Sequence, residues 1–303
     1  MPPKVKRPDA VSEKKVRLYA TLDEAWRAAE SRFAPPKATW GSPTLDGLTG
    51  GFRRGDLAVL AGFHRQGKTA FCIHAALGAA RAGKRVAYAT LDSERSTLLL
   101  RMGGAAAHWD IRGWWEGRIT PQQLEQIRQK TPFPPGLFLY FHDDALAGAG
   151  GVLASCEALK EEKGLDLLVI DGLRPLLRDG GNETDEKRAL KELIILLKVW
   201  ARDLGCQVLA TLPMGEEIGS PIGPGIAVTS LTLWEMGLPE SAVDLIMTID
   251  LNRAPEHLSA PDHVQVAVLK NRYGPVQIYR IGFDRRSCAL TGVEGPSGSP
   301  MSY

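Results

Sequence analysis

The stretch Asp56–Thr69, DLAVLAGFHRQGKT, decides the fold class of this chain. Its first six residues, Asp56–Ala61, form an apolar run of strand length. Its last eight, Gly62–Thr69, match the pattern GxxxxGK followed by Ser or Thr. The next residues, Ala70–Ala82, have a helical pattern. A strand, a glycine-rich loop and a helix in this order predict a phosphate-binding P-loop, and this setting argues against a chance match in a glycine-rich chain.

The residue types of this loop suit the binding of Mg-ATP. Glycines let backbone amides turn toward phosphate oxygens, and the helix N-terminus adds partial positive charge. We expect Lys68 to contact the β and γ phosphates and Thr69 to hold Mg²⁺. The predicted nucleotide-binding residues are Gly62, Phe63, His64, Arg65, Gln66, Gly67, Lys68, Thr69 and Ala70.

Short apolar runs alternate with helical patterns along the rest of the chain. This alternation predicts an α/β fold with a mostly parallel sheet flanked by helices. The strongest helical pattern runs from about Glu183 to Leu204. The last run, Val276–Phe283, closely follows Gly274-Pro275, which predicts an antiparallel hairpin at the C-terminus. The other predicted strands are Asp56–Ala61, Arg85–Leu91, Leu165–Asp171, Cys206–Leu212, Val243–Asp250 and Val264–Leu269.

Two of these strands end in acids that suit ATP hydrolysis. Leu165–Asp171 delivers Asp171, which we expect to be the second magnesium-side ligand, although such an acid also initiates turns. Arg85–Leu91 is followed by Asp92, which we expect to orient the attacking water. Glu94 has an alternative role as a helix-start residue, because acids are favoured in the first helical turn.

Composition narrows the class of protein. At 303 residues and 44% hydrophobic content the chain has enough apolar side chains for a sizeable core. The 37 Lys and Arg against 35 Asp and Glu give a net charge of +2, so any DNA site must be local. The four cysteines are widely spread and lack metal-ligand spacing. No apolar run has membrane-spanning length and no signal peptide is evident, so we expect a cytoplasmic protein without membrane contact.

The composition also divides the chain. Residues 1–20 are predicted to be a basic flexible arm, and residues 21–39 a helix and linker that open with the capping-box pattern Thr21 to Glu24. Residues 40–290 hold the alternating pattern and form the predicted ATPase domain. Residues 291–303 are rich in Gly, Ser and Pro, which predicts a disordered tail.

Several of these motifs together resemble the motor domain of DnaB-type replicative helicases. The run Leu45–Leu57, the P-loop and Leu91–Glu94 with Arg101 carry the likeness, which extends from about Thr44 to Arg286. The resemblance implies a RecA-like motor that uses ATP and Mg²⁺, binds single-stranded DNA, forms a hexameric ring of identical subunits and meets replication proteins. Two departures concern hydrolysis: Asp92 stands where the family has glutamate, and Leu212-Pro213 where it has a γ-phosphate-sensing glutamine.

The likeness also implies a DNA site and a catalytic turn. Trp234-Glu235-Met236-Gly237 is similar to the family's DNA-facing loop, so Trp234, Glu235 and Gly237 are predicted to bind DNA; a buried core Trp is the alternative. Lys270-Asn271-Arg272 resembles a turn whose cations reach the γ-phosphate of a neighbouring subunit, which makes Lys270 and Arg272 predicted catalytic residues beside Lys68 and Asp92. Solvated charges at a hairpin turn are the alternative there.

Three functions follow from these motifs. The leading hypothesis is a ring-forming ATP-dependent DNA helicase of replication. The altered residues Asp92 and Pro213 leave open a RecA-like ATP-binding module that assembles on DNA or a protein without unwinding. A small-molecule kinase would use the same P-loop but would leave the turn of Lys270 and Arg272 without a role.

Overall fold

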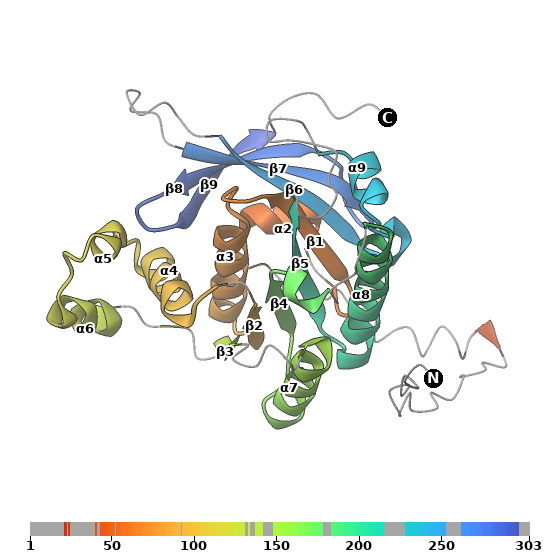
Figure 1. Cartoon of the computed structure of the whole chain (residues 1–303), viewed down its shortest axis with the longest axis horizontal. Helices are drawn as coiled ribbons and strands as arrows, with labels where there is room; N and C mark the ends of the chain where they lie inside the picture. The colour runs from red at the N-terminus through yellow and green to blue at the C-terminus, as the bar shows by residue number, and fades with distance from the viewer. Residues whose placement is uncertain are drawn as a thin grey trace. The chain divides into compact units, whose positions relative to one another are not determined.

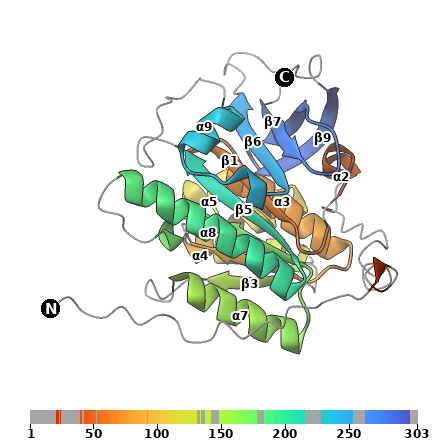
Figure 2. The same cartoon turned by 90° about the vertical axis from the view of Figure 1, so that its right-hand side faces the viewer.

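The computed structural model describes residues 21–22, 24, 40, 43–51, 53–91, 93–130, 133, 137–141, 148–177, 183–214, 228–252 and 262–296 (Figures 1 and 2). Contacts divide the chain into residues 1–36 and residues 37–303. In the first unit the amide of Thr21 donates to Glu24 Oε2 (3.3 Å) and the amide of Glu24 to Thr21 Oγ1 (3.1 Å), which confirms the capping box. The predicted basic arm and the rest of the predicted helix lie outside the described residues.

The second unit is built on a nine-stranded sheet in the order β3-β2-β4-β5-β1-β6-β7-β8-β9. The strands from β3 to β6 are parallel, and β6 to β9 pair antiparallel. The strands are β1 (Leu57–Phe63), β2 (Val86–Thr90), β3 (Leu137–Phe141), β4 (Leu167–Asp171), β5 (Gln207–Met214), β6 (Leu245–Asn252), β7 (Asp262–Asn271), β8 (Ile278–Asp284) and β9 (Ala289–Pro296).

Helices cover both faces of this sheet (Figure 1). One face carries α2, α3 and α4, and the other carries α7, α8 and α9, as the two buried clusters show. The helices are α2 (Pro43–Thr49), α3 (Lys68–Arg81), α4 (Arg95–Ala107), α5 (Arg112–Trp115), α6 (Pro121–Lys130), α7 (Gly148–Glu162), α8 (Glu183–Leu204) and α9 (Ser230–Glu235), with 3-10 helices η1 (Arg174–Leu176) and η3 (Glu240–Ala242). Among the described residues, no helix has both the length and the apolar content to cross a bilayer.

The predicted α/β fold, its strands and the helix Glu183–Leu204 are confirmed. The C-terminal antiparallel pairing is more extensive than the predicted hairpin, because β9 adds to β8. Its residues Thr291 to Pro296 were expected in a disordered tail, and that expectation was wrong: pairing with β8 gives their backbone groups partners despite the Gly and Pro content. Residues 297–303 lie outside the described part.

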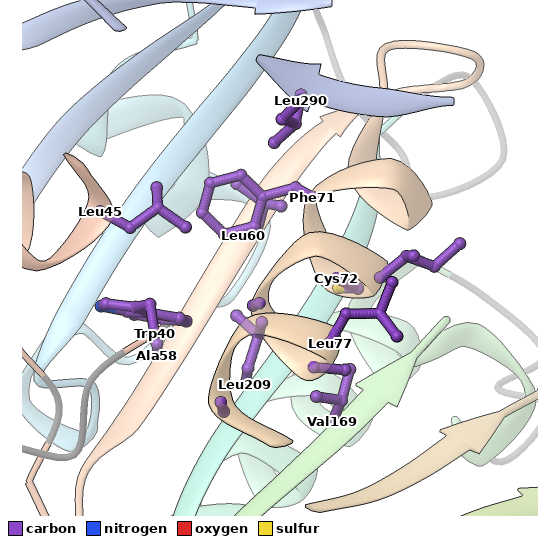
Figure 3. Close-up of a cluster of buried hydrophobic side chains, with 14 of the residues drawn as sticks. Trp40, Leu45, Ala58, Leu60, Phe71, Cys72, Leu77, Val169, Leu209 and Leu290 are labelled. Carbon is purple, nitrogen blue, oxygen red and sulfur yellow. The ribbon is translucent and has the colours of Figure 1, made fainter. Parts of the chain in front are cut away.

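The core beneath α3 fixes the P-loop strand to its helix. Phe71 of α3 is fully buried with Leu60 of β1 and Leu290 of β9 in one cluster (Figure 3). Trp40 meets Phe71 edge to face at 6.1 Å, and its Nε1 donates to Thr49 Oγ1 (2.7 Å). Each such large apolar side chain contributes ~1.5–3 kcal/mol on burial. This packing holds the start of α3 in place against the end of β1.

Candidate functional site: a nucleotide pocket

The P-loop joins β1 to α3 through a turn that needs its glycines. A Cβ on Gly62 would lie 2.8 Å from the carbonyl oxygen of Ile249 on β6. Gly67, directly before α3, has φ 95° and lies against Val264. Glycine adopts the left-handed backbone conformation without steric strain. Because it has no side chain, it also lets the loop lie close to the sheet. The loop is therefore shaped by β6 and β7 as well as by its own sequence.

Two side chains of the loop hold it in its own conformation. Lys68 Nζ donates to the carbonyl oxygens of Gly62 (2.8 Å) and Phe63 (2.7 Å). Gln66 Oε1 accepts a bond from the Leu251 amide (2.7 Å), which ties the turn to β6. The bonds from the ammonium to the carbonyl oxygens are already charge-assisted, but a phosphate oxygen also carries negative charge and so attracts the Lys68 ammonium more strongly than an uncharged carbonyl does. This conformation of the loop is compatible with a bound polyanion.

Asp171 ends β4 as a buried and firmly oriented carboxylate. Tyr88 Oη donates to its Oδ2 (2.9 Å), and Thr211 Oγ1 donates to its Oδ1 (3.1 Å). The Gly172 amide in turn donates to Thr211 Oγ1 (2.7 Å). Burial, with the nearby Asp171 charge, raises the pKa of Tyr88 well above its usual value, so the phenol remains a neutral donor. This network fixes the direction of the carboxylate.

These groups meet in a pocket of about 360 Å³, a volume typical of small-ligand sites. Lys68, Thr69 and Asp171 line the same space, as predicted from sequence. A buried carboxylate and a hydroxyl are oxygen donors of the kind Mg²⁺ takes while keeping several waters, so Thr69 and Asp171 fit that ion. The pocket is lined by His64, Arg65, Gln66, Gly67, Lys68, Thr69, Ala70, Ser93, Arg101, Asp171, Gly172, Thr211, Pro213, Leu251, Phe283 and Cys288.

Several lining residues were not predicted as site residues. Arg101 comes from α4, Thr211 from β5, and Phe283 from β8. Cys288, in the turn between β8 and β9, is half-buried, unlike the other three cysteines, which are buried. Thr211, Phe283 and Cys288 belong to no motif in the sequence and reach the pocket because the sheet order brings β5 and β8 around the loop, whereas Arg101 is one of the residues that carry the family resemblance. Thr211 had one signal, since a hydroxyl in a buried strand needs a partner.

The predicted water-orienting acid, Asp92, lies outside the described residues. Its neighbour Ser93 lines the pocket, so the chain passes the site at this point. Glu94 is the N-cap of α4, which confirms its alternative role as a helix-start residue. Its Oε1 accepts a bond from Ser96 Oγ at 2.7 Å.

Pro213 lines the pocket from β5, where it lies beside Gly62, the first residue of the P-loop, in the pairing of β1 with β5. A proline inside a sheet removes one donor. The pairing of β4 with β5 ends at Ile170 and Ala210, so Pro213 lies in the part of β5 that extends beyond β4. The wall therefore presents a ring without hydrogen-bonding groups at the position of the family's glutamine.

Lys270 and Arg272 lie at the opposite end of the parallel strands. Arg272 follows β7 and forms an ion pair with Asp244 Oδ1 (3.1 Å), while Asp244 Oδ2 accepts the amide of Leu57, the first residue of β1. Lys270 Nζ donates to the carbonyl oxygens of Val243 (2.7 Å) and, at shorter range, Glu240. Burial lowers the pKa of Lys270. Neither cation lines the pocket, because β1 separates them from the P-loop by about 20 Å.

The predicted DNA-facing residues lie on and just after α9. Trp234 is 66% exposed, which excludes the alternative of a buried core Trp. Glu235 is also exposed. Gly237 has φ 94°, and a Cβ there would lie 2.6 Å from the Lys187 carbonyl oxygen on α8. The glycine thus lets α9 pack closely on α8, and the Trp234 ring faces solvent.

A largely parallel sheet between two helical layers, with a P-loop after β1 and an acid after β4, defines a RecA-like P-loop ATPase fold. The family model of the DnaB-like helicase C-terminal domain matches residues 39–291. The chain belongs to this family.

Curated relatives and solved structures agree with this assignment. The chain is 25% identical over 259 residues to the replicative DNA helicase DnaB of Geobacillus stearothermophilus, covering 84% of this chain and 56% of that protein. The replicative DNA helicase DnaC of Bacillus subtilis is 25% identical over 258 residues, with the same coverage of each chain. This chain therefore spans about half the length of these curated relatives.

Solved structures share the fold at lower identity. One that is described as an ATPase domain superposes with a TM-score of 0.74 at 18% identity, over 91% of this chain and 100% of that one. A second, described as a DnaB-like replicative helicase and its interactions with primase, gives a TM-score of 0.72 at 18% identity, over 91% of this chain and 68% of that one. At this identity both likenesses support the fold alone.

Proposed function

We propose that this chain is the motor of a ring-forming DNA helicase that hydrolyses Mg-ATP to move along single-stranded DNA and unwind duplex during replication. The observation that carries the proposal is the separation of Arg272 from the P-loop pocket of its own chain by the length of β1. A permanently charged guanidinium suits the phosphate charge of the transition state. At this distance Arg272 serves only the pocket of another copy, which requires an assembly of identical subunits.

The pocket residues have distinct roles in this proposal. Lys68 transfers its ammonium from the loop carbonyls to the β and γ phosphates. Thr69 and Asp171 hold Mg²⁺, which supplies neutralisation of the charge shared by those phosphates. Asp92 orients the attacking water, and Lys270 and Arg272 form the turn that completes the neighbour's site. Trp234, Glu235 and Gly237 belong to the DNA-facing segment, where the exposed ring packs against bases or sugars.

The partners of the motor follow from the family. We propose single-stranded DNA, five further copies in a hexameric ring, and replication proteins, among them primase, with which one structurally similar helicase is described as interacting. The net charge of +2 makes the DNA contact local and dependent on the assembled ring. We place the motor in the cytoplasm.

The test measures ATP hydrolysis with and without single-stranded DNA over a range of protein concentrations. We expect stimulation by DNA and a rise in specific activity with concentration. Lys68→Ala is expected to lower hydrolysis about 10²–10³-fold, and Arg272→Ala about 10³-fold. Arg280→Ala, an exposed arginine on β8, is the matched control and should keep full activity.

Mixed assemblies test whether Arg272 acts between subunits. A Lys68→Ala subunit keeps its arginine, and an Arg272→Ala subunit keeps its pocket. Mixing the two inactive variants should restore part of the activity, because some interfaces then join an intact pocket to an intact arginine. No recovery at any mixing ratio would rule out the proposed role in a neighbour's site.

A second function is favoured by Pro213: an ATP-binding module that assembles on DNA or a protein partner without unwinding. The proline supplies no side-chain hydrogen-bonding group to the pocket at a position beside the first residue of the P-loop. A forked DNA substrate separates the two functions. Strand separation driven by ATP supports the helicase, whereas DNA-stimulated hydrolysis without strand separation supports the module.

A further inference from the structure

Asp244, which directly precedes β6, joins four parts of the chain at the edge away from the pocket. Its amide donates to the Leu57 carbonyl oxygen (2.9 Å), and its own carbonyl oxygen accepts the Arg272 amide (3.0 Å). Its Oδ2 accepts the Leu57 amide (2.9 Å) and the ammonium of Lys198 on α8. The side chain is 2% exposed. One buried carboxylate therefore connects β1, α8, β6 and the turn after β7.

The two oxygens of this carboxylate have different surroundings. Oδ2 is held by a backbone amide and a buried ammonium, which is in turn bound to the Gly55 carbonyl oxygen (2.6 Å). Oδ1 accepts no hydrogen bond within the described part of the chain, and its ion-pair contact there is Arg272 Nη1 at 3.1 Å. Thus one oxygen anchors the carboxylate, and the other attracts the arginine through charge.

Hydrogen bonds hold the backbone on either side of Arg272, whereas its guanidinium group remains partly exposed to solvent. Asn271 Nδ2 donates to the Thr49 carbonyl oxygen (3.2 Å), and Asn271 Oδ1 accepts the Tyr273 amide (3.1 Å). The Tyr273 ring stacks under the guanidinium of Arg53, 3.6 Å from its centre. The Arg272 side chain, by contrast, is 43% exposed. A rigid turn thus presents one half-exposed cation, whose buried contact is Asp244.

We propose that Asp244 is the positioning residue that aims Arg272 at the pocket of a second copy of this chain, an inference that rests on the proposed function of Arg272. The same carboxylate binds the first residue of β1, whose last residues begin the P-loop. Within one subunit, β1 and the Asp244 side chain therefore connect the pocket to Arg272, the arginine that enters the pocket of the next subunit. Lys270, whose ammonium is bound to carbonyls of its own chain, shapes the turn that carries the arginine.

The test uses Asp244→Asn, which keeps an oxygen for the Leu57 amide and removes the charge that attracts Arg272. We expect nucleotide affinity of the variant, measured with a fluorescent ATP analogue, to stay within about twofold, while kcat falls about 100-fold, as a misplaced catalytic group predicts. Asp262→Asn, which removes another Asp–Arg ion pair, with Arg285, is the matched control and should keep kcat.

Mixed assemblies distinguish positioning from structural damage. A subunit with Asp244→Asn should restore activity when mixed with Lys68→Ala, because its pocket is intact, and should restore none when mixed with Arg272→Ala. The reverse pattern would show that Asp244 serves its own pocket and would overturn the inference. Failure of the Lys68→Ala and Arg272→Ala mixture would instead reject the proposed function itself.

A second variant covers the case in which Asp244→Asn does not fold because the Lys198 ammonium is left buried without an anion. The double variant Asp244→Asn with Lys198→Met removes both charges and keeps the apolar stem of the lysine. It is expected to give the same mixing pattern as Asp244→Asn. Full activity in the double variant would also overturn the inference.

Discussion

The two ends of β1 differ in how their charged groups are partnered. At Phe63 the strand opens into a pocket, where the Lys68 ammonium donates to the backbone carbonyl oxygens of Gly62 and Phe63. At Leu57 it enters a buried cluster in which Asp244 is matched by Lys198 and Arg272. In the first arrangement the ammonium lies at the loop where the P-loop motif predicts phosphate, and in the second the buried charges are matched within the chain and one arginine is half-exposed. In the proposed function, one end receives phosphate and the other presents a cation.

The largest expected effect is on ATP hydrolysis, when the carboxylate of the pocket is removed and the cluster at the other end of β1 is left intact. Asp171→Asn replaces the proposed magnesium-side ligand, a charged carboxylate, with an amide, so Mg-dependent hydrolysis should fall by about 10²-fold or more. The cluster at the other end should be unaffected, so assembly measured by light scattering should be unchanged. Asp110→Asn, which removes an exposed pair with Arg112, is the control and should keep its activity. Equal activity of Asp171→Asn and the native chain would contradict the role of the carboxylate.

A smaller effect is expected from filling the space beneath the P-loop. In Gly62→Ala the new methyl would meet the Ile249 carbonyl oxygen at 2.8 Å, which forces β1 and β6 apart. We expect a loss of ~2–3 kcal/mol in the free energy of unfolding, measured with urea. Gly150→Ala in α7 has open space around it, so it should instead stabilise by ~0.5–1 kcal/mol. Equal stabilities of the two variants would contradict the close approach of the loop to β6.

The pocket shows how far sequence reasoning reached. Lys68, Thr69 and Asp171 were predicted because each belongs to a local pattern, a loop or a strand end, and the structure brings them into one pocket. Arg101 was noted only through the family resemblance and not as a site residue, and Phe283 has no local pattern, since its place depends on the order of strands in the sheet. Local motifs identify the chemistry of the site, and long-range packing completes its walls.

The buried charged cluster at the opposite edge of the sheet has one sequence feature that could have predicted it. Lys198 lies on the apolar stripe of α8, one helical turn after Ile194 and beside Leu197, where a charge needs a buried partner. That pattern predicts a carboxylate facing the helix but not which one. Among the strands, β3 was missed although Pro135 and Gly136 bound its apolar run, and β9 was missed because its Gly and Pro content resembles a loop.

The charged cluster also makes a prediction about pH. Burial, followed by the nearby Asp244 charge, raises the pKa of Asp56 from 3.8 to about 6. The folded chain therefore binds a proton between about pH 6 and pH 3.8 that the unfolded chain does not, so this group favours folding more as the pH falls through that window. Above pH 6 the buried charge costs up to ~3 kcal/mol.

Asp56→Asn removes this titrating group from the end of β1 that lies away from the pocket. We expect the variant to be more stable than the native chain by ~2 kcal/mol at about pH 8, with the difference shrinking toward zero near about pH 4. The measurement is urea unfolding of both proteins across that range, in which the titrations they share cancel. A difference that does not change with pH would show that Asp56 has an ordinary pKa.

The smallest expected effect concerns the segment that connects the two edges. The chain leaves the pocket edge at the end of β5 and reaches the opposite edge at the start of β6, and α9 with Trp234 lies on this connection. Because the ring is exposed, Trp234→Ala should leave stability unchanged. If the ring stacks on DNA, affinity for single-stranded DNA should fall about tenfold, at the lower end of the ~1–3 kcal/mol of a stacked base.

Trp114→Ala, a partly exposed tryptophan on α5, is the control and should bind normally in the same fluorescence anisotropy titration. Loss of DNA affinity together with DNA-stimulated hydrolysis in Trp234→Ala, with basal hydrolysis retained, would place the DNA contact between the pocket and the exposed arginine. Equal affinities of both variants and the native chain would move that contact to another part of the chain.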